Sequence, residues 1–146
     1  MYEKYGQFID GQWCQSSDKQ TYDVINPATE EIIGKASKAS PEDVDRALKS
    51  SEKGLNTWKK TPPWQRASIL RKIADTIREK RNVLAKWMTL ENGKPLAEGA
   101  AEVNGTADIF EWNAEETKRI YGQTVESRFP DTRVHVYYQP VGVVAA

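Results

Sequence analysis

The sequence feature that most constrains the fold is an apolar run over residues 137–146, which reads YYQPVGVVAA. An unbroken run of small and β-branched residues is typical of a strand that is covered on both faces. A parallel strand of this kind needs a crossover helix and neighbouring strands to bury it. No such elements follow in the sequence. We therefore expect the chain to be the front part of a larger protein.

Charge balance and cysteine content limit the class of partners. The 146 residues suit one domain and include 21 basic and 21 acidic side chains, so the formal net charge is zero. Bulk electrostatics therefore draws the chain neither to nucleic acid nor to an anionic membrane. No apolar run reaches about 18 residues, and no secretory signal begins the chain. We therefore expect no nucleic-acid or membrane partner. A single cysteine cannot form an internal disulfide, so we expect a cytoplasmic protein.

Short strands are predicted at both ends of the chain. Residues 8–13 (FIDGQW) predict a hairpin turning at Asp-Gly, and residues 21–25 predict a strand that ends at an Asn-Pro turn. Residues 31–34 predict another short strand. Near the other end, residues 124–128 and 133–138 predict two strands, joined by a turn and exposing edges that could pair with another chain.

Three amphipathic helices are predicted between these strands. The first begins after Ser40, which is an N-cap residue with Asp43 three positions later. The second covers residues 61–92 and ends at Gly93. The third covers residues 96–121, is closed by Gly122, and has a narrow, alanine-rich apolar seam. Because the seam lasts only about three heptads, packing against the second helix and a sheet is favoured over a coiled coil.

Basic side chains gather on the predicted second helix, mostly off its apolar stripe. A cluster of this kind could bind an anion, but a solvated helix face is the favoured interpretation. The residues are Arg66, Arg71, Lys72, Arg78, Lys80 and Arg81.

The residues that usually carry catalysis are scarce. Cys14 is the only thiol, and its sequence neighbours include no basic residue that would activate it. His135 is the only histidine, and its strand position favours a surface role. One Cys and one His cannot form a zinc site, and the sequence contains neither Gly-x-Gly-x-x-Gly nor a Walker-type phosphate loop. We predict no catalytic residue in this chain.

Two interpretations remain open at this point. Five Trp and six Tyr, together with the narrow seam, are compatible with a self-sufficient helical protein-interaction module without enzymatic activity. The apolar run at residues 137–146 favours instead a segment of a larger protein.

Four short segments, taken in order, resemble one family. They are FIDGQW at residues 8–13, INPATEE at 25–31, LENGKP at 90–95 and QPVGV at 139–143. Together they resemble the N-terminal part of the NAD(P)-dependent aldehyde dehydrogenase superfamily, over essentially the whole chain. Residues 88–98 and 111–122 are most similar to succinate-semialdehyde dehydrogenases, and related semialdehyde dehydrogenases stay open as alternatives.

The resemblance implies a truncated α/β fold, the N-terminal portion of an aldehyde dehydrogenase. Residues 1–120, with an N-terminal β segment and three amphipathic helices, would be the N-terminal part of the cofactor-binding domain. Residues 121–138 would form a β oligomerisation arm that pairs with a neighbouring subunit of a homo-oligomer. Residues 139–146 would be the first strand of a Rossmann-type sheet, cut short.

The family chemistry is implied in the same way. A cysteine thiolate attacks a small aldehyde, hydride passes to NAD or NADP, and a glutamate-activated water hydrolyses the thioester to the acid. No residue of this sequence matches the catalytic Cys, the general-base Glu or the cofactor-binding residues of the family. We therefore expect the chain by itself to be inactive and to bind no NAD or NADP, and its sequence does not choose between the two cofactors.

Two minor sites are also implied by the resemblance. Backbone oxygens of Val24 and Ile25, with the carboxylate of Glu91, match a monovalent-cation site of some members, although Asp is frequent where this chain has Glu. Four residues on the third predicted helix match positions that line the aldehyde channel. They are Gly105, Thr106, Phe110 and Asn113. Relatives carry bulkier residues at some of these positions, so substrate preference does not transfer.

Overall fold

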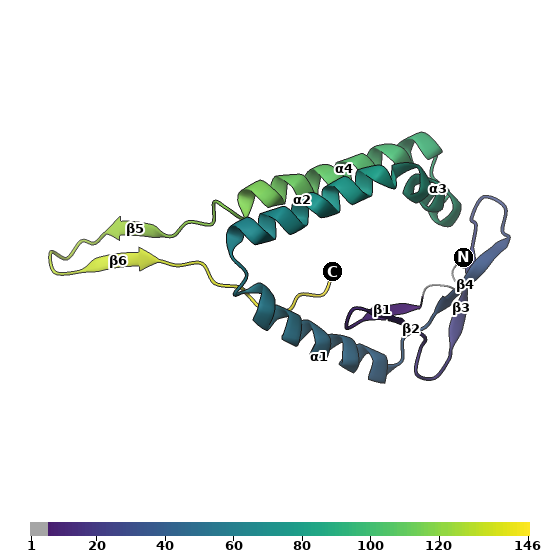
Figure 1. Cartoon of the computed structure of the whole chain (residues 1–146), viewed down its shortest axis with the longest axis horizontal. Coiled ribbons are helices and arrows are strands. Elements are labelled where there is room, and N and C mark those ends of the chain that lie inside the picture. The colour runs from purple at the N-terminus through teal and green to yellow at the C-terminus, as the bar shows by residue number, and fades with distance from the viewer. Residues whose placement is uncertain (1–5) are drawn as a thin grey trace.

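The computed structural model describes residues 6–146 and shows four helices and six short strands there (Figure 1). The strands form three separate antiparallel pairs, β1–β2, β3–β4 and β5–β6. In chain order the elements are β1 (Gln7–Ile9), β2 (Gln12–Cys14), β3 (Thr21–Ile25), β4 (Ile32–Ser37), α1 (Pro41–Trp58), α2 (Pro63–Glu79), α3 (Arg81–Asn92), α4 (Leu96–Glu116), β5 (Gln123–Glu126) and β6 (Arg133–Val136). In Figure 1, α4 runs alongside α2, and the β5–β6 hairpin projects away from the helices.

The predicted hairpins are confirmed, with small changes of length. Asp10 and Gly11 both have positive φ, 54° and 77°, which is what a two-residue type I′ turn requires. The turn after β3 forms at Asn26, whose Oδ1 accepts a hydrogen bond from the Ala28 N–H at 3.0 Å. β5 and β6 are each shorter than predicted and end at Glu126 and Val136.

The N-terminus of α1 has the predicted capping box. The Asp43 N–H donates to Ser40 Oγ at 3.2 Å, and the Ser40 N–H donates to Asp43 Oδ2 at 3.0 Å. Asp43 also accepts from Ser16 Oγ at 3.1 Å and from the Ser17 N–H at 3.1 Å. Gln7 Nε2 of β1 donates to the same oxygen at 3.4 Å. The carboxylate of Asp43 thus joins α1 to β1 and to the segment that follows β2.

The environment of Asp43 favours its charged form. The residue is only 1% exposed. The backbone N–H of Ser40 makes the largest contribution to lowering the pKa of this carboxyl, and Ser17, the Ser40 hydroxyl and Ser16 lower it further, against an opposing effect of burial. The pKa therefore lies well below the usual 3.8.

The predicted second helix is wrong in one respect, because it is two helices and not one. Lys80 has φ −90° and ψ 6°, which ends α2 and starts α3. The sequence between Ile77 and Leu84 supplies no core residue, since Val83 is 55% exposed. The break lets Leu84 and Met88 of α3 pack with Ile77 against the cluster of Ala85, Ala100 and Val103. Residues 6–146 therefore contain four helices where three were predicted.

The predicted end of the third helix is also wrong. α4 stops at Glu116, and the N–H groups of Lys118 and Arg119 bond to carbonyls three residues back, which tightens the last turn. Gly122 does not cap the helix. It lies at the base of the β5–β6 hairpin, where a Cβ would come within 2.5 Å of the Val136 carbonyl oxygen. Close approach of the backbone explains the glycine at this position.

The buried core consists of small side chains from α2, α3 and α4. A Cβ on Gly99 would lie 3.1 Å from the carbonyl oxygen of Ala85, so α3 and α4 approach closely there. This confirms that the alanine-rich seam packs against the predicted second helix, here α2 and α3. The predicted packing of the seam against a sheet is not found, because no strand within residues 6–146 is a main partner of α4. The buried apolar residues are Ala67, Ala74, Ala85, Ala100, Val103, Ala107 and Ala114.

Large apolar side chains remain on the surface instead. Trp64 is 74% exposed and Trp112 is 69% exposed. Among the described residues, the largest side chain that is less than 2% exposed is that of Asp43. No helix within residues 6–146 is long and apolar enough to cross a membrane.

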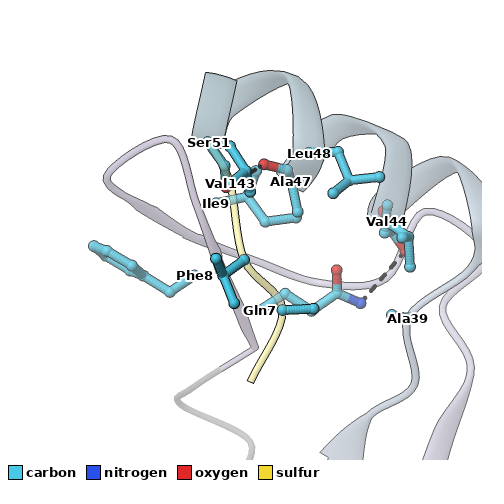
Figure 2. Close-up of a pocket in the computed structure, with 12 residues that line it drawn as sticks. Gln7, Phe8, Ile9, Ala39, Val44, Ala47, Leu48, Ser51 and Val143 are labelled. Atoms are coloured by element: carbon cyan, nitrogen blue, oxygen red, sulfur yellow. Dashed lines mark hydrogen bonds between the residues drawn. The ribbon is translucent and has the colours of Figure 1, made fainter. Parts of the chain in front are cut away.

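Residues 139–146 form no strand, although the sequence predicts one there. A strand requires a hydrogen-bonded neighbour, and these residues are paired with none within the described part of the chain. Val143 instead lies in a groove of about 390 Å³ between β1 and α1, lined also by Ile9 and Ala47 (Figure 2). The tail therefore rests beside β1 without extending its sheet.

Replacing Asp43 by Asn should make the chain less stable in a pH-dependent way. A carboxyl whose folded pKa is lowered contributes stability above its unfolded value of 3.8, and loses it as the pH falls towards the folded pKa. The difference in unfolding free energy between wild type and Asp43→Asn should thus be full at neutral pH and shrink below 3.8. Urea unfolding followed by circular dichroism measures it. Asp45→Asn, on the exposed side of α1, is the matched control and should show little effect. A pH-independent difference for Asp43→Asn would contradict the assignment.

Enlarging a buried alanine of α4 should destabilise the helix contacts. Ala107 is 0% exposed, so Ala107→Leu should lower the free energy of unfolding by about 1–3 kcal/mol through overpacking. Ala101→Leu, on the exposed side of the same helix, should be close to neutral. Equal effects of the two substitutions in urea unfolding would show that the seam is not tightly packed.

Candidate functional site

The end of α3 meets the turn that follows β3. Gly93 ends α3 with φ 78°, and its N–H donates to the Thr89 carbonyl at 2.9 Å. A Cβ on Gly93 would come within 2.9 Å of Pro27 Cγ, so the two segments are in direct contact. Ile25 lies two residues before Pro27, and Glu91 lies two residues before Gly93. The residues of the predicted cation site therefore come from two segments that meet.

The local backbone at this junction is irregular. Val24 pairs with Gly34 and Ile25 pairs with Ile32, so Ile33 is an extra residue that forms a β-bulge. A bulge disrupts the ladder and leaves backbone groups outside it. Val24 is half-buried and Glu91 is exposed. The described residues contain no cluster of three or more His, Cys, Asp or Glu side chains. A monovalent-cation site built on backbone oxygens stays a prediction.

A groove of about 760 Å³ lies where four distant segments meet. They are the end of α1, the start of α2, the C-terminal half of α4 with the residues just after it, and the segment after β6. The groove is lined by Trp58, Lys59, Arg66, Leu70, Ile109, Phe110, Asn113, Glu116, Thr117, Arg119, Ile120, Tyr138, Gln139 and Pro140. An apolar concavity with a few polar groups is the usual form of a small-molecule site.

Only two of the four predicted channel residues line this groove. Phe110 and Asn113 do so, whereas Gly105 and Thr106 lie further towards the N-terminus of α4 and outside it. Thr106 Oγ1 donates to the Glu102 carbonyl at 2.9 Å, and Asn113 Nδ2 donates to the Ile109 carbonyl at 2.8 Å. Their role in an aldehyde channel stays a prediction.

The groove also contains residues that sequence reasoning missed. Trp58, Lys59 and Tyr138 belong to segments far from α4 in the sequence. No local pattern could have joined them, because each segment reads as an ordinary helix end or strand end. Arg66 was noticed only as one member of the basic cluster on α2.

The basic cluster on α2 lies on an exposed face, as favoured from the sequence, and two of its members form ion pairs there. Arg71 forms an ion pair with Glu115, and Arg78 forms ion pairs with Asp108 at 2.8 Å and Glu111 at 2.6 Å. The hydrogen bonds that Arg78 donates to Asp108 and then to Glu111 raise the pKa of Arg78 above its usual value. These pairs join α2 to α4.

Arg66 differs from the other arginines of α2 in its partners. Its Nε donates to Thr117 Oγ1 at 3.1 Å, and its Nη1 donates to the Thr61 carbonyl at 3.0 Å. Both acceptors are neutral, and within residues 6–146 the guanidinium forms no ion pair. Arg66 thus lines the groove together with Glu116 but forms no ion pair with it.

Cys14 has a basic neighbour that the sequence did not reveal, which corrects the earlier expectation. Arg46 lies in α1, 32 residues after Cys14 in the sequence, and its Nη2 donates to Cys14 Sγ at 3.2 Å. His135 lies on another sheet, exposed, with Nδ1 3.2 Å from Thr124 Oγ1. Cys14 in β2 and His135 in β6 belong to different sheets, so the described residues contain no cysteine nucleophile paired with a histidine base.

Comparison with known proteins gives a consistent result. The model of the aldehyde dehydrogenase family matches residues 13–146. A glutarate-semialdehyde dehydrogenase of Pseudomonas aeruginosa is 42% identical over 139 residues, which are 95% of this chain and 29% of that protein. An NADP(+) succinate-semialdehyde dehydrogenase of Escherichia coli is 38% identical over 138 residues, 94% of this chain and 29% of that protein.

The fold is also similar to that of solved structures. A betaine aldehyde dehydrogenase of Staphylococcus aureus, crystallised with NAD+, matches 90% of this chain and 27% of its own with a TM-score of 0.82 and 32% identity. The chain thus spans less than a third of the length of the relatives that it matches.

Replacing Gly93 by Ala should destabilise the junction of α3 with the β3 turn. A non-glycine residue in the left-handed region costs about 1–2 kcal/mol, and the new Cβ would also press on Pro27. Gly54→Ala in α1 is the control with the opposite sign, because no atom lies within 4 Å of its Cβ position. It should stabilise the helix by about 0.5–1 kcal/mol. Thermal unfolding of both variants measures the two effects, and a neutral Gly93→Ala would contradict the close contact.

Proposed function

Because this chain belongs to the aldehyde dehydrogenase family, we propose that it is the N-terminal segment of an NAD(P)-dependent enzyme that oxidises a semialdehyde to its acid. Succinate semialdehyde is the proposed substrate, with its homologue glutarate semialdehyde as the alternative. The observation that carries the proposal is the identity of 42% and 38% to two semialdehyde dehydrogenases over nearly the whole chain. Both substrates carry a carboxylate at the end away from the aldehyde.

The residues of this chain do not fit a nucleotide cofactor by themselves. A dinucleotide binds outside the carboxyl ends of parallel strands, and the three sheets of the described residues are antiparallel pairs. Residues 139–146, which are the proposed first strand of the cofactor sheet, are unpaired. We therefore assign the contacts to NAD or NADP, the catalytic cysteine and the general-base glutamate to the part of the longer enzyme that this chain does not span.

The proposed role of this chain is to build one side of the enzyme. Residues 1–120 would form the N-terminal part of the cofactor-binding domain. Residues 121–138 would pair with a neighbouring subunit of a homo-oligomer. The β5–β6 hairpin within them supports this role, because every residue of both strands is exposed and each strand has a free edge. A cytoplasmic location remains part of the proposal, on the basis of the single cysteine.

A self-sufficient interaction module is less well supported. An independent domain buries its large apolar side chains, whereas Trp64, Trp112 and Ile109 are each more than 60% exposed here. The buried core is almost entirely alanine. Such surfaces are typical of a segment that packs against other parts of a protein.

The purified chain should not reduce NAD or NADP in the presence of succinate or glutarate semialdehyde. Cys14 lies beside Arg46, which stays protonated and cannot act as a general base, and the catalytic residues are assigned to the part of the enzyme that this chain does not span. Absorbance of the reduced nicotinamide measures turnover, and the intact Pseudomonas aeruginosa relative is the positive control. Turnover that disappears in Cys14→Ser would overturn the assignment of catalysis to residues outside this chain.

A further inference from the structure

We propose that Asn92 is a site of spontaneous deamidation, and that its deamidation loosens the junction of α3 with the turn after β3. The sequence contains two Asn-Gly pairs, Asn92-Gly93 and Asn104-Gly105. Asparagine is a thermolabile residue, and a glycine after it, without a Cβ, hinders the reaction least. Both pairs have the same chemistry, so only the backbone around them can separate their rates. Neither the reaction nor its consequence depends on the proposed enzymatic function.

The reaction needs only the two residues of the pair and water. The backbone nitrogen of the glycine attacks the side-chain carbonyl carbon of the asparagine. A bond forms between these two atoms, and the bond from that carbon to the side-chain nitrogen breaks. Ammonia leaves with the proton of the glycine nitrogen, and a cyclic imide remains. Water then opens the imide at either carbonyl, which gives aspartate or isoaspartate without transfer of an electron to or from an outside group.

The two side-chain amides are equally available for this reaction. Asn92 and Asn104 are both exposed, and neither amide forms a hydrogen bond within residues 6–146. The difference lies in the attacking nitrogen, because the N–H of each glycine must first leave a helical hydrogen bond. The free energy of local opening therefore decides which pair reacts.

Gly93 lies at the end of a helix, where local opening is easy. Its N–H donates to the Thr89 carbonyl at 2.9 Å, and residues 93–95 lie outside any helix, so no further turn holds this bond in place. The last turn of α3 contains Glu91 and no basic residue. A negative charge is unfavourable at the C-terminal end of a helix dipole. The last turn of α3 is thus a segment that opens at low cost.

Gly105 lies in the interior of α4 instead. Val103 and Ala107 flank it and are 4% and 0% exposed. Val103 packs in the same buried cluster as Ala85 of α3. Freeing the N–H of Gly105 therefore requires opening α4 on both sides and disturbing the buried seam. We expect Asn104 to be protected and Asn92 to react.

Deamidation of Asn92 would change the junction of α3 with the turn after β3. A Cβ on Gly93 would come within 2.9 Å of Pro27 Cγ, so the backbone at the end of α3 lies directly on this turn. Isoaspartate adds a methylene group to the main chain just before Gly93. Either product also places a new negative charge beside Glu91 at the C-terminal end of the helix. Both changes disfavour the native contact.

The test is incubation of the 146-residue chain in mildly alkaline buffer, followed by proteolysis after glutamate and mass spectrometry. Glu98 and Glu102 lie between the two Asn-Gly pairs and separate them into different peptides. In the folded chain we expect Asn92 to convert about tenfold faster than Asn104, which corresponds to about 1.4 kcal/mol in the free energy of local opening. In urea, where both helices are unfolded, the two rates should agree within about threefold.

Two conservative variants assign the signal to its site. Asn92→Gln should abolish most of the deamidation of the folded chain, whereas Asn104→Gln is the matched control and should leave it unchanged. Deamidated chain, separated by anion exchange, should melt at a lower temperature than fresh chain. No conversion of Asn92 in the folded chain, equal or faster conversion of Asn104, or undiminished deamidation in Asn92→Gln would each overturn the site. An unchanged melting temperature would overturn its effect on the junction.

Discussion

The contact between α2 and α4 depends on side chains no larger than valine where the helices meet. Ala67 and Ala74 on α2 oppose α4, whose buried positions are Ala100, Val103, Ala107 and Ala114. This close approach brings Arg71 and Arg78 within reach of the acids on α4, and Arg66 within reach of Thr117. The groove depends on the same contact, because one of its walls comes from each helix.

A second constraint joins the β segment to the helices. Asp43 is buried and receives hydrogen bonds from three separate places in the chain, which include Gln7 of β1 and Ser17 after β2. A buried carboxylate is tolerated only where donors compensate its lost hydration. Few large apolar side chains are buried here. The hydrogen bonds to Asp43 therefore hold the β segment against α1, a role that apolar burial has in a complete domain. The exposed apolar surfaces agree with a chain that spans less than a third of its relatives.

Local signals predicted much of the fold. The Asp10-Gly11 turn, the Ser40 cap and the Gly93 helix end were all placed correctly, because each depends on the conformational preference of one or two residues. The break at Lys80 was missed, since no Pro or Gly marks it and packing against α4 decides it. The end of α4 was placed too late because the apolar spacing continues to Tyr121 beyond the last helical turn.

For the candidate site, too, the sequence predicted some features and missed others. The sequence alone determined the family, through four ordered segments. The resemblance also named Gly105, Thr106, Phe110 and Asn113 as channel positions, which stay a prediction. Only the tertiary structure decided that Phe110 and Asn113 share a groove with Arg66, Lys59 and Tyr138, and that Arg46 lies beside Cys14. The reason is physical: hairpin turns and helix caps are local interactions between near neighbours, whereas a groove and its charge balance exist only after distant segments have packed together.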